Sequence, residues 1–392
     1  MTYQLLGNRV RICFGCGGSV PAPIAGGHIT CPACGATQTV SPRRSLPSAR
    51  FVGVEVASER ERLELLRKQL DGRPSHYASF DAPERLAHLE LAYDDVRLPI
   101  LLLEAFRKAV KRCESAAGES ASFDLQRDVC WIAGKARNSF SMRNVVLRAA
   151  PYIATALDVV RDPGLVQQLL LMSCDMARHG GDLARADALL ALCDARSMFV
   201  DLDSDYRTTA AMLALARDNP RRALQLVGAR DSDVPFCAAT IYQARMTRTA
   251  ALELLGLRDE AERALCQNRD VLGDEIVSDW LEGSRLLAPA ADVWRRIRAR
   301  DGDDNGDGDD DWHELAECEW FDVEDASAPP TSLPPVAELP DLLAPASNSA
   351  GSPYRDAPFD TPVEALAPMR MPAPPMSVLF SVLALLALMI TL

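Results

Sequence analysis

Four cysteines near the N-terminus have a spacing that suits a metal ion. Cys13 and Cys16 form one Cys-x-x-Cys pair, and Cys31 and Cys34 form a second pair after 14 intervening residues. The two-residue spacing lets both sulfurs of a pair point at the same ion. Because four thiolates suit tetrahedral Zn2+ and leave no open coordination position, the pattern predicts a structural zinc site that is not catalytic.

The second pair resembles the knuckle of the zinc-ribbon family, in which the sequence Cys-Pro-x-Cys-Gly is common. Residues 31–35 read Cys-Pro-Ala-Cys-Gly. The resemblance implies a small β zinc ribbon over residues 1–40, followed by a basic linker at 41–54. A segment this short has almost no core, so its folding is expected to depend on the metal. Two redox dithiols or an iron–sulfur site are the alternatives.

The other seven cysteines are scattered and mostly lie in apolar stretches with a helical pattern. Such a distribution is typical of reduced, buried thiols. Residues 1–13 lack the apolar segment that a secretory signal peptide requires. We therefore expect the folded part of the chain to lie in the cytosol.

Helical patterns dominate from residue 55 to residue 300, and we expect a mainly α domain there. Ser58 and Glu61 form a capping box, which marks the start of a charged helix. Further helical patterns follow, and Pro151 is expected to kink or divide one of them.

An internal repeat runs over residues 164–270. Three segments have the pattern of a turn that joins one helix to the next, and their last residues are Ala186, Ala223 and Ala261. Successive alanines are 37 and 38 residues apart. A small residue is needed where two helices cross closely, and a larger apolar residue four positions later fills the adjacent gap. These larger residues are Leu190, Val227 and Leu265. The pattern resembles the tetratricopeptide repeat (TPR), and this resemblance implies a TPR-like scaffold whose concave surface binds a protein partner. An irregular helical bundle is the alternative.

The negative charge of the chain is concentrated in one region. Residues 301–375 contain 18 Asp and Glu residues against two arginines, and 13 of the 26 prolines lie within residues 326–375. This composition cannot bury enough apolar surface to fold, so it predicts an acidic, then Pro-rich, disordered tether.

Part of this acidic region matches the calcium-binding loop pattern of EF-hands. Asp303, Asn305, Asp307 and Glu314 would supply the oxygen ligands of Ca2+. The eighth position of the loop is an aspartate, where EF-hand loops usually carry an apolar residue that pairs with a second loop, and the sequence has no second loop. We therefore favour a solvated acidic linker over a calcium site.

The last 17 residues, Met376 to Leu392, contain no charged residue. As a helix they would be about 25 Å long, close to the ~30 Å hydrocarbon core of a membrane. We expect a transmembrane tail anchor at 376–392, with a single pass and the folded domains facing the cytoplasm. The alternative is an apolar helix that docks on a partner or on the repeats.

No catalytic motif is found in the sequence, and the five histidines are dispersed. We therefore predict a membrane-tethered adaptor or regulatory protein without catalytic activity, which binds protein partners through its helical repeats and zinc ribbon. The second hypothesis is a regulator associated with nucleic acid. In that hypothesis five arginines near the ribbon contact phosphates. They are Arg9, Arg11, Arg43, Arg44 and Arg50.

Overall fold

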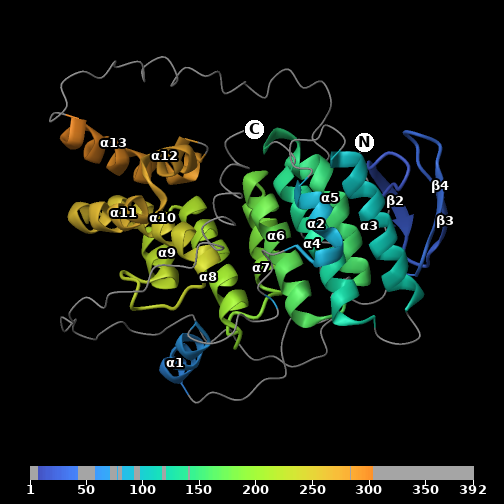
Figure 1. The fold of residues 1–392 in the computed structure, drawn as a ribbon, viewed down its shortest axis with the longest axis horizontal. Coiled ribbons are helices and arrows are strands. Elements are labelled where there is room, and N and C mark those ends of the chain that lie inside the picture. The colour runs from blue at the N-terminus through green and yellow to red at the C-terminus, as the bar shows by residue number, and fades with distance from the viewer. Residues whose placement is uncertain are drawn as a thin grey trace.

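The computed structural model describes most of the N-terminal three quarters of the chain (Figure 1). The described residues are 8–42, 58–70, 77, 82–91, 98–116, 121–139, 142–282 and 284–302. The predicted calcium loop and tail anchor lie outside these ranges. The predicted tether does too, except for residues 301 and 302, which end the last described helix. Among the helices in the described ranges, none combines the length and the apolar character needed to cross a membrane.

The N-terminal part consists of two small antiparallel hairpins. Strand β1 (Asn8–Ile12) pairs with β2 (Ser19–Pro23), and β3 (Gly27–Thr30) pairs with β4 (Thr37–Val40). Their shared core is small and includes two of the cysteines. It contains Cys13, Val20, Ala22, Ile29, Cys31 and Val40. The rest of the described chain is helical, so the predicted mainly α fold with a small N-terminal β region is confirmed.

Helix α1 (Glu59–Leu70) lies against α8 (Val200–Ala216), away from the strands (Figure 1). The helices that follow it in the chain form the end of the body beside the strands (Figure 1). They are η1 (Glu84–Leu86), α2 (Ala87–Leu91), α3 (Leu98–Ser115), α4 (Phe123–Ser139) and α5 (Met142–Val159). The predicted capping box begins α1: the Glu61 carboxylate accepts from the Ser58 N–H at 3.0 Å, and the Ser58 hydroxyl accepts from the Glu61 N–H at 3.3 Å.

Helix α5 runs through Pro151 without a break, so the expected division there is wrong. Proline removes one backbone hydrogen bond from a helix interior. Tyr152 and Ile153, which follow Pro151, are buried in the main core, and this burial offsets the loss.

Three helix pairs follow over the region of the internal repeat. They are α6 (Pro163–His179) with α7 (Leu183–Leu190), α8 (Val200–Ala216) with α9 (Pro220–Val227), and α10 (Ala238–Leu254) with α11 (Arg258–Leu272). The repeat alanines Ala186, Ala223 and Ala261 each lie in the second helix of a pair and are fully buried. The chain then continues through α12 (Asp274–Glu282), η2 (Arg285–Leu287) and α13 (Ala288–Gly302).

Substitution of Ala223 by Leu tests the packing of these pairs. The side chain of Ala223 is fully buried in the core shared by α8 to α13. Added volume at such a position forces neighbouring helices apart, so we expect a loss of about 1–3 kcal/mol in the free energy of unfolding. Thermal denaturation measures it, with the exposed Ala184→Leu as control. Equal melting temperatures for the two variants would contradict the placement of Ala223.

Two apolar cores fill the body. One lies under α3 to α7 and includes Ile12 from strand β1, and the other lies between α8 and α13. Partly buried Leu190 and Tyr206 pack against both cores. Strand β1 therefore shares a core with the helices, although the sequence divides the hairpins and the helices into separate domains.

Candidate metal centre

The two cysteine pairs occupy equivalent turns, one after β1 and one after β3. The Gly17 N–H donates to the Cys13 carbonyl at 2.8 Å, and the Gly35 N–H donates to the Cys31 carbonyl at 2.9 Å. Gly17 and Gly35 have φ angles of 77° and 71°, in the left-handed region that glycine adopts without strain. The same turn is thus built twice from the same local pattern.

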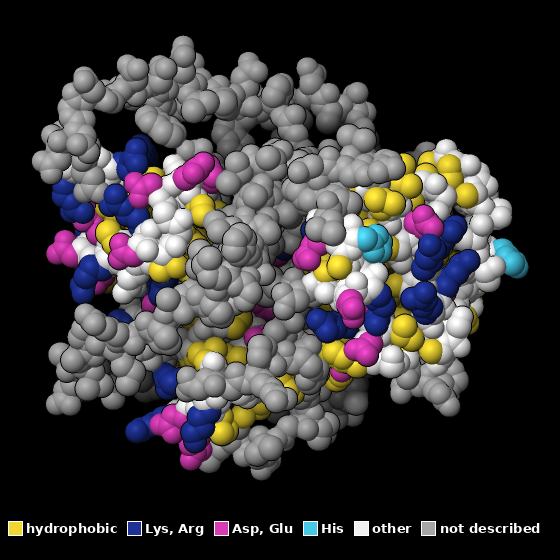
Figure 2. Space-filling model, in the orientation of Figure 1, with side chains coloured by type: hydrophobic (Ala, Val, Ile, Leu, Met, Phe, Trp, Pro, Cys, Tyr) yellow, Lys and Arg dark blue, Asp and Glu magenta, His cyan; other side chains and the backbone are white. Residues whose placement is uncertain are grey.

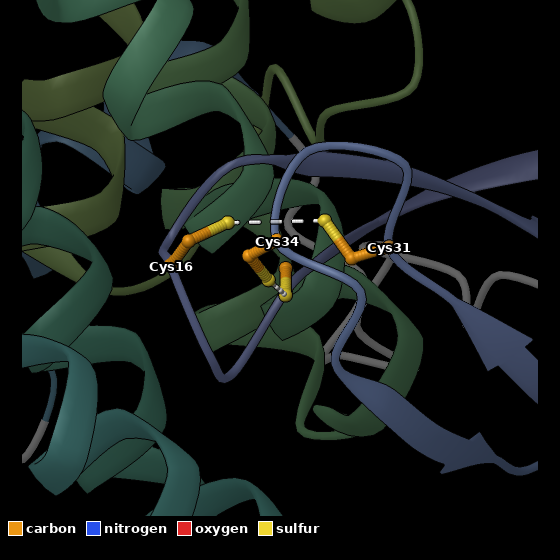
Figure 3. A group of neighbouring side chains, drawn as sticks. Cys16, Cys31 and Cys34 are labelled. Atoms are coloured by element: carbon orange, nitrogen blue, oxygen red, sulfur yellow. Dashed lines mark hydrogen bonds between the residues drawn. The ribbon is translucent and has the colours of Figure 1, made fainter.

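The four cysteine sulfurs converge on one point. All four Sγ atoms lie within 4.8 Å of one another. Cys13 Sγ is 3.6 Å from Cys34 Sγ, and Cys16 Sγ is 3.8 Å from Cys31 Sγ (Figure 3). Zinc–sulfur bonds of about 2.3 Å place the sulfurs of a tetrahedron about 3.8 Å apart. The cluster therefore has the dimensions of a four-thiolate metal site, and the structure brings together all four predicted ligands.

The thiols of the cluster differ in their environments. Burial raises the pKa of the Cys13 thiol to about 12, although the N–H groups of Gly15 and Cys16 act in the opposite direction. Cys31 is also subject to burial, which raises its pKa. Hydrogen bonds from the N–H groups of Cys34 and Ala33 and from neighbouring thiols outweigh this effect and lower the pKa to about 7. Four thiolates this close together need a cation, which a divalent metal supplies.

Two residues that the sequence did not single out, Gln38 and Gly15, allow the two knuckles to lie close together. The Gln38 amide donates to the Ile12 carbonyl at 2.9 Å and accepts from the Phe14 N–H at 2.9 Å, so it ties β4 to the first knuckle. Gly15 lies so close to the second knuckle that a Cβ atom there would be 2.8 Å from the Ala36 Cβ. A single sequence carries no signal for either role, because both depend on the approach of the two hairpins.

His28 is not part of the cluster. Its exposed ring lies on β3, with Nδ1 3.0 Å from the Thr39 hydroxyl. The described residues contain one group of three or more His, Cys, Asp or Glu side chains close enough to share a metal ion, and it is the four-cysteine cluster.

Strand β1 fixes the cluster to the helical body. The Thr155 hydroxyl of α5 accepts from the Ile12 N–H at 2.9 Å. Arg11 is buried, 3.1 Å from Asp158 on one side and 3.1 Å from Glu114 on the other. Arg9 is buried too, and its Nε lies 3.5 Å from Asp158.

These contacts correct the predicted role of two arginines. Arg9 and Arg11 face acidic side chains inside the protein, so they are not available to the phosphates of a nucleic acid. The sequence could not reveal this, because Asp158 lies 147 residues from Arg11. Arg43, Arg44 and Arg50 lie outside the described residues.

Comparison of the chain with protein families, with curated proteins and with solved structures found no match. The zinc-ribbon fold that residues 31–35 suggest therefore stays a prediction.

Proposed function

We propose that this protein is a zinc-stabilised adaptor without catalytic activity. The observation that supports the proposal most is the four-cysteine cluster, whose sulfur spacing suits Zn2+ and whose four ligands leave no coordination position for a substrate. A closed site of this kind stabilises a fold. The cluster is joined through β1 to α5, so zinc would fix one end of the helical body.

The helical body is the proposed partner-binding part. Three consecutive helix pairs, α6–α7, α8–α9 and α10–α11, each with a buried alanine near the start of its second helix, support the proposal of a TPR-like scaffold. Stacked pairs of this kind offer extended surfaces for protein partners. We propose a protein as the partner, and the zinc ribbon as a second recognition module.

The adaptor proposal is tested by affinity capture with the full chain, before and after nuclease treatment. The expected result is a protein that is retained after nuclease treatment and rebinds the purified chain in a stoichiometric complex. Capture that disappears with nuclease would contradict a protein partner and favour the second candidate below.

The apolar tail is proposed to anchor the adaptor to a membrane with its folded part in the cytoplasm. Residues 376–392 carry no charge, and leucine is their commonest residue. Substitution of Leu385 by Arg should disfavour insertion by about 2.5–3.5 kcal/mol, because a charge at mid-span opposes transfer into hydrocarbon. Carbonate extraction of membranes measures this: the parent chain should resist extraction, and the Leu385→Arg variant should be released. Release of the parent chain would show that the tail only docks.

A second candidate function, binding of nucleic acid, is favoured by the exposed face of α3. This basic face consists of Arg107, Lys108, Lys111 and Arg112 (Figure 2). Lys108 is paired with Glu104 at 2.7 Å, whereas no ion-pair partner of Lys111 or Arg112 is found in the described ranges. The face lies beside the first knuckle, where Gly17 approaches Leu103. These four cations replace Arg9 and Arg11 as the side chains that could contact phosphates.

Charge reversal on α3 tests this candidate. In duplex DNA, log K falls with log salt concentration by about 0.9 per phosphate neutralised. The double variant Lys111→Glu and Arg112→Glu should therefore reduce that slope by about 2. Fluorescence anisotropy with a labelled duplex measures the slope, and the exposed Lys68→Glu on α1 is the control. An equal slope in all three proteins would exclude the basic face as a phosphate-binding surface.

A further inference from the structure

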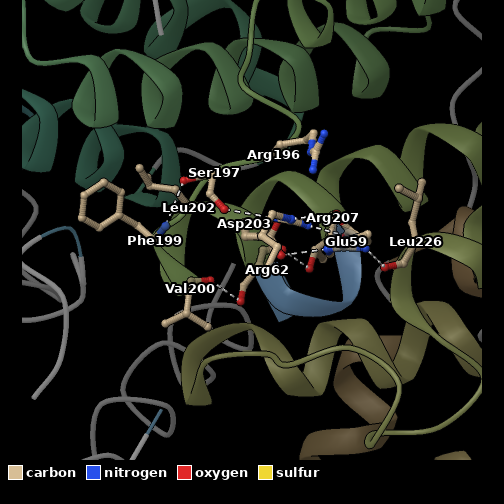
Figure 4. Close-up of polar contacts among 12 residues, drawn as sticks. Glu59, Arg62, Arg196, Ser197, Phe199, Val200, Leu202, Asp203, Arg207 and Leu226 are labelled. Carbon is tan, nitrogen blue, oxygen red and sulfur yellow. Dashed lines mark hydrogen bonds and ion pairs between the residues drawn. The ribbon is translucent and has the colours of Figure 1, made fainter. Parts of the chain in front are cut away.

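Helix α1 is held on the body by one deeply buried arginine. The Arg62 side chain is fully buried, although α1 as a whole is strongly charged. Its guanidinium donates to Asp203 at 2.7 Å and to the Ser197 carbonyl at 2.8 Å (Figure 4). The same group also donates to Glu59, one turn earlier on α1, at 2.7 Å.

The site that receives Arg62 is built from α8 and the segment that precedes it. We call it the Asp203 socket, and it comprises the Asp203 carboxylate, the Arg207 guanidinium and the Ser197 carbonyl. Asp203 is fully buried and also accepts from Arg207 at 2.8 Å. Arg207 in turn donates to Glu59 at 2.7 Å, which closes a ring of four charged side chains between α1 and α8.

A second polar contact fixes the other end of α1. The Gln69 amide donates to the Met198 carbonyl at 2.6 Å and accepts from the Val200 N–H at 3.0 Å. Leu66 lies between the two polar contacts and is fully buried. Glu59, Arg62, Leu66 and Gln69 are spaced by three, four and three residues, so they occupy one face of the helix.

Helix α1 buries few side chains for an element of a folded core, and polar contacts, including those of Arg67 with the Ser232 and Asp233 carbonyls at 2.8 and 3.0 Å, make up most of its attachment. Only Arg62 and Leu66 of its 12 residues are buried. Buried ion pairs lose much of their attraction to desolvation, and a helix of this length is marginal in water without packing. An element held in this way opens more readily than the core helices around it.

We propose that the Asp203 socket is a docking site for an α-helix of a partner protein, and that α1 fills it in cis. The partner helix carries the pattern Glu-x-x-Arg-x-x-x-Leu-x-x-Gln, as α1 does from Glu59 to Gln69. Arginine is required at the second position, because the guanidinium makes four hydrogen bonds there, one to Asp203, one to Ser197 and two to Glu59. A lysine ammonium has three donors and cannot form the paired contact with Glu59. This inference rests on the proposed adaptor function and names the partner's recognition element.

The experiment uses a fluorescent, N-acetylated peptide of residues 57–71 as the probe and the full chain as the receptor. In the parent chain, α1 competes at an effective concentration on the order of millimolar. In the Arg62→Ala chain, α1 loses its anchor and frees the socket. We expect the peptide to bind the Arg62→Ala chain at least tenfold more tightly than the parent chain, with Lys68→Ala as the matched control chain.

A second peptide keeps the test independent of receptor folding. The peptide with Arg62→Lys should bind the same Arg62→Ala chain at least tenfold more weakly than the unmodified peptide. Equal binding of the two peptides, or no peptide binding to the Arg62→Ala chain, would overturn the proposal. Either result would exclude the Asp203 socket as a partner site but would not contradict the adaptor function. The adaptor function is contradicted only if affinity capture yields no protein partner.

Discussion

Substitution of Cys31 by Ser is expected to abolish zinc binding and to unfold the hairpins. Purified parent protein should contain about one zinc per chain, and the variant should contain none. The apolar core of the hairpins consists of six residues, two of which are cysteines of the cluster. The metal must therefore supply most of the stability of this region, and structural zinc contributes about 10–16 kcal/mol of apparent binding free energy in small zinc domains.

Elemental analysis measures the zinc content, and limited proteolysis of residues 1–42 measures the unfolding. The matched control is Cys113→Ser, because Cys113 is a buried thiol on α3, outside the cluster. This control should keep its zinc. Iron–sulfur absorbance in the parent protein, or zinc retained by the Cys31→Ser variant, would contradict a zinc site.

The zinc site should also depend on pH in a defined direction. The ligands bind the metal as thiolates, so protons compete with zinc for all four sulfurs. Zinc affinity should therefore fall as the pH falls, and elemental analysis of the protein after dialysis at each pH measures the zinc that is retained. Because Ile12 belongs to the main core, the melting temperature of the helices should fall as zinc is lost.

Substitution of Asp158 by Ala is expected to destabilise the whole protein by about 3–5 kcal/mol. The side chain of Asp158 is 7% exposed and forms ion pairs with two buried arginines. Arg11 Nη1 lies 3.1 Å and Arg9 Nε lies 3.5 Å from Asp158 Oδ2. Removal of the shared carboxylate leaves Glu114 as the acid beside Arg11, while the positive charge of Arg9 stays buried close to that of Arg11. Breaking a buried ion pair on one side costs far more than the pair contributes in net stability, because the remaining charge stays desolvated.

Denaturant unfolding followed by circular dichroism measures this loss. The control is Glu64→Ala, which removes a pair with Arg60 whose side chains are 53% and 89% exposed. Exposed pairs of this kind contribute about 0–1 kcal/mol. A similar effect of both variants would show that Asp158 of α5 is not buried against β1.

The sequence predicted the features that depend on local spacing. The knuckles require two cysteines and a glycine within five residues, and Cys31 to Gly35 meet that requirement without any distant contact. The capping box of Ser58 and Glu61 likewise specifies the start of α1. The alanines of the internal repeat predicted where small, buried side chains lie, because helix pairs repeat the same local geometry.

The features that the sequence left open depend on contacts between distant segments. Arg11 looks like a surface residue of a basic region until Asp158 and Glu114 are placed beside it. Arg62 lies in a charged helix whose composition favours exposure to solvent. It is buried because it pairs with Asp203, which lies 141 residues away in the sequence. In both cases a long side chain crosses an interface, and charge alone does not distinguish a solvated arginine from a buried one.

The union of β1 with α5 has a consequence for synthesis on the ribosome. Arg11 and Asp158 are separated by 147 residues, so the hairpins emerge well before the helix that they contact. At translation rates of 5–20 residues per second, the delay is about 7–30 s. Both cysteine pairs are complete once Cys34 has been made, and the 124 residues from Cys34 to Asp158 still take about 6–25 s at these rates. We therefore expect the metal to be acquired by the nascent chain, so that α5 closes onto a surface that has already been shaped by zinc.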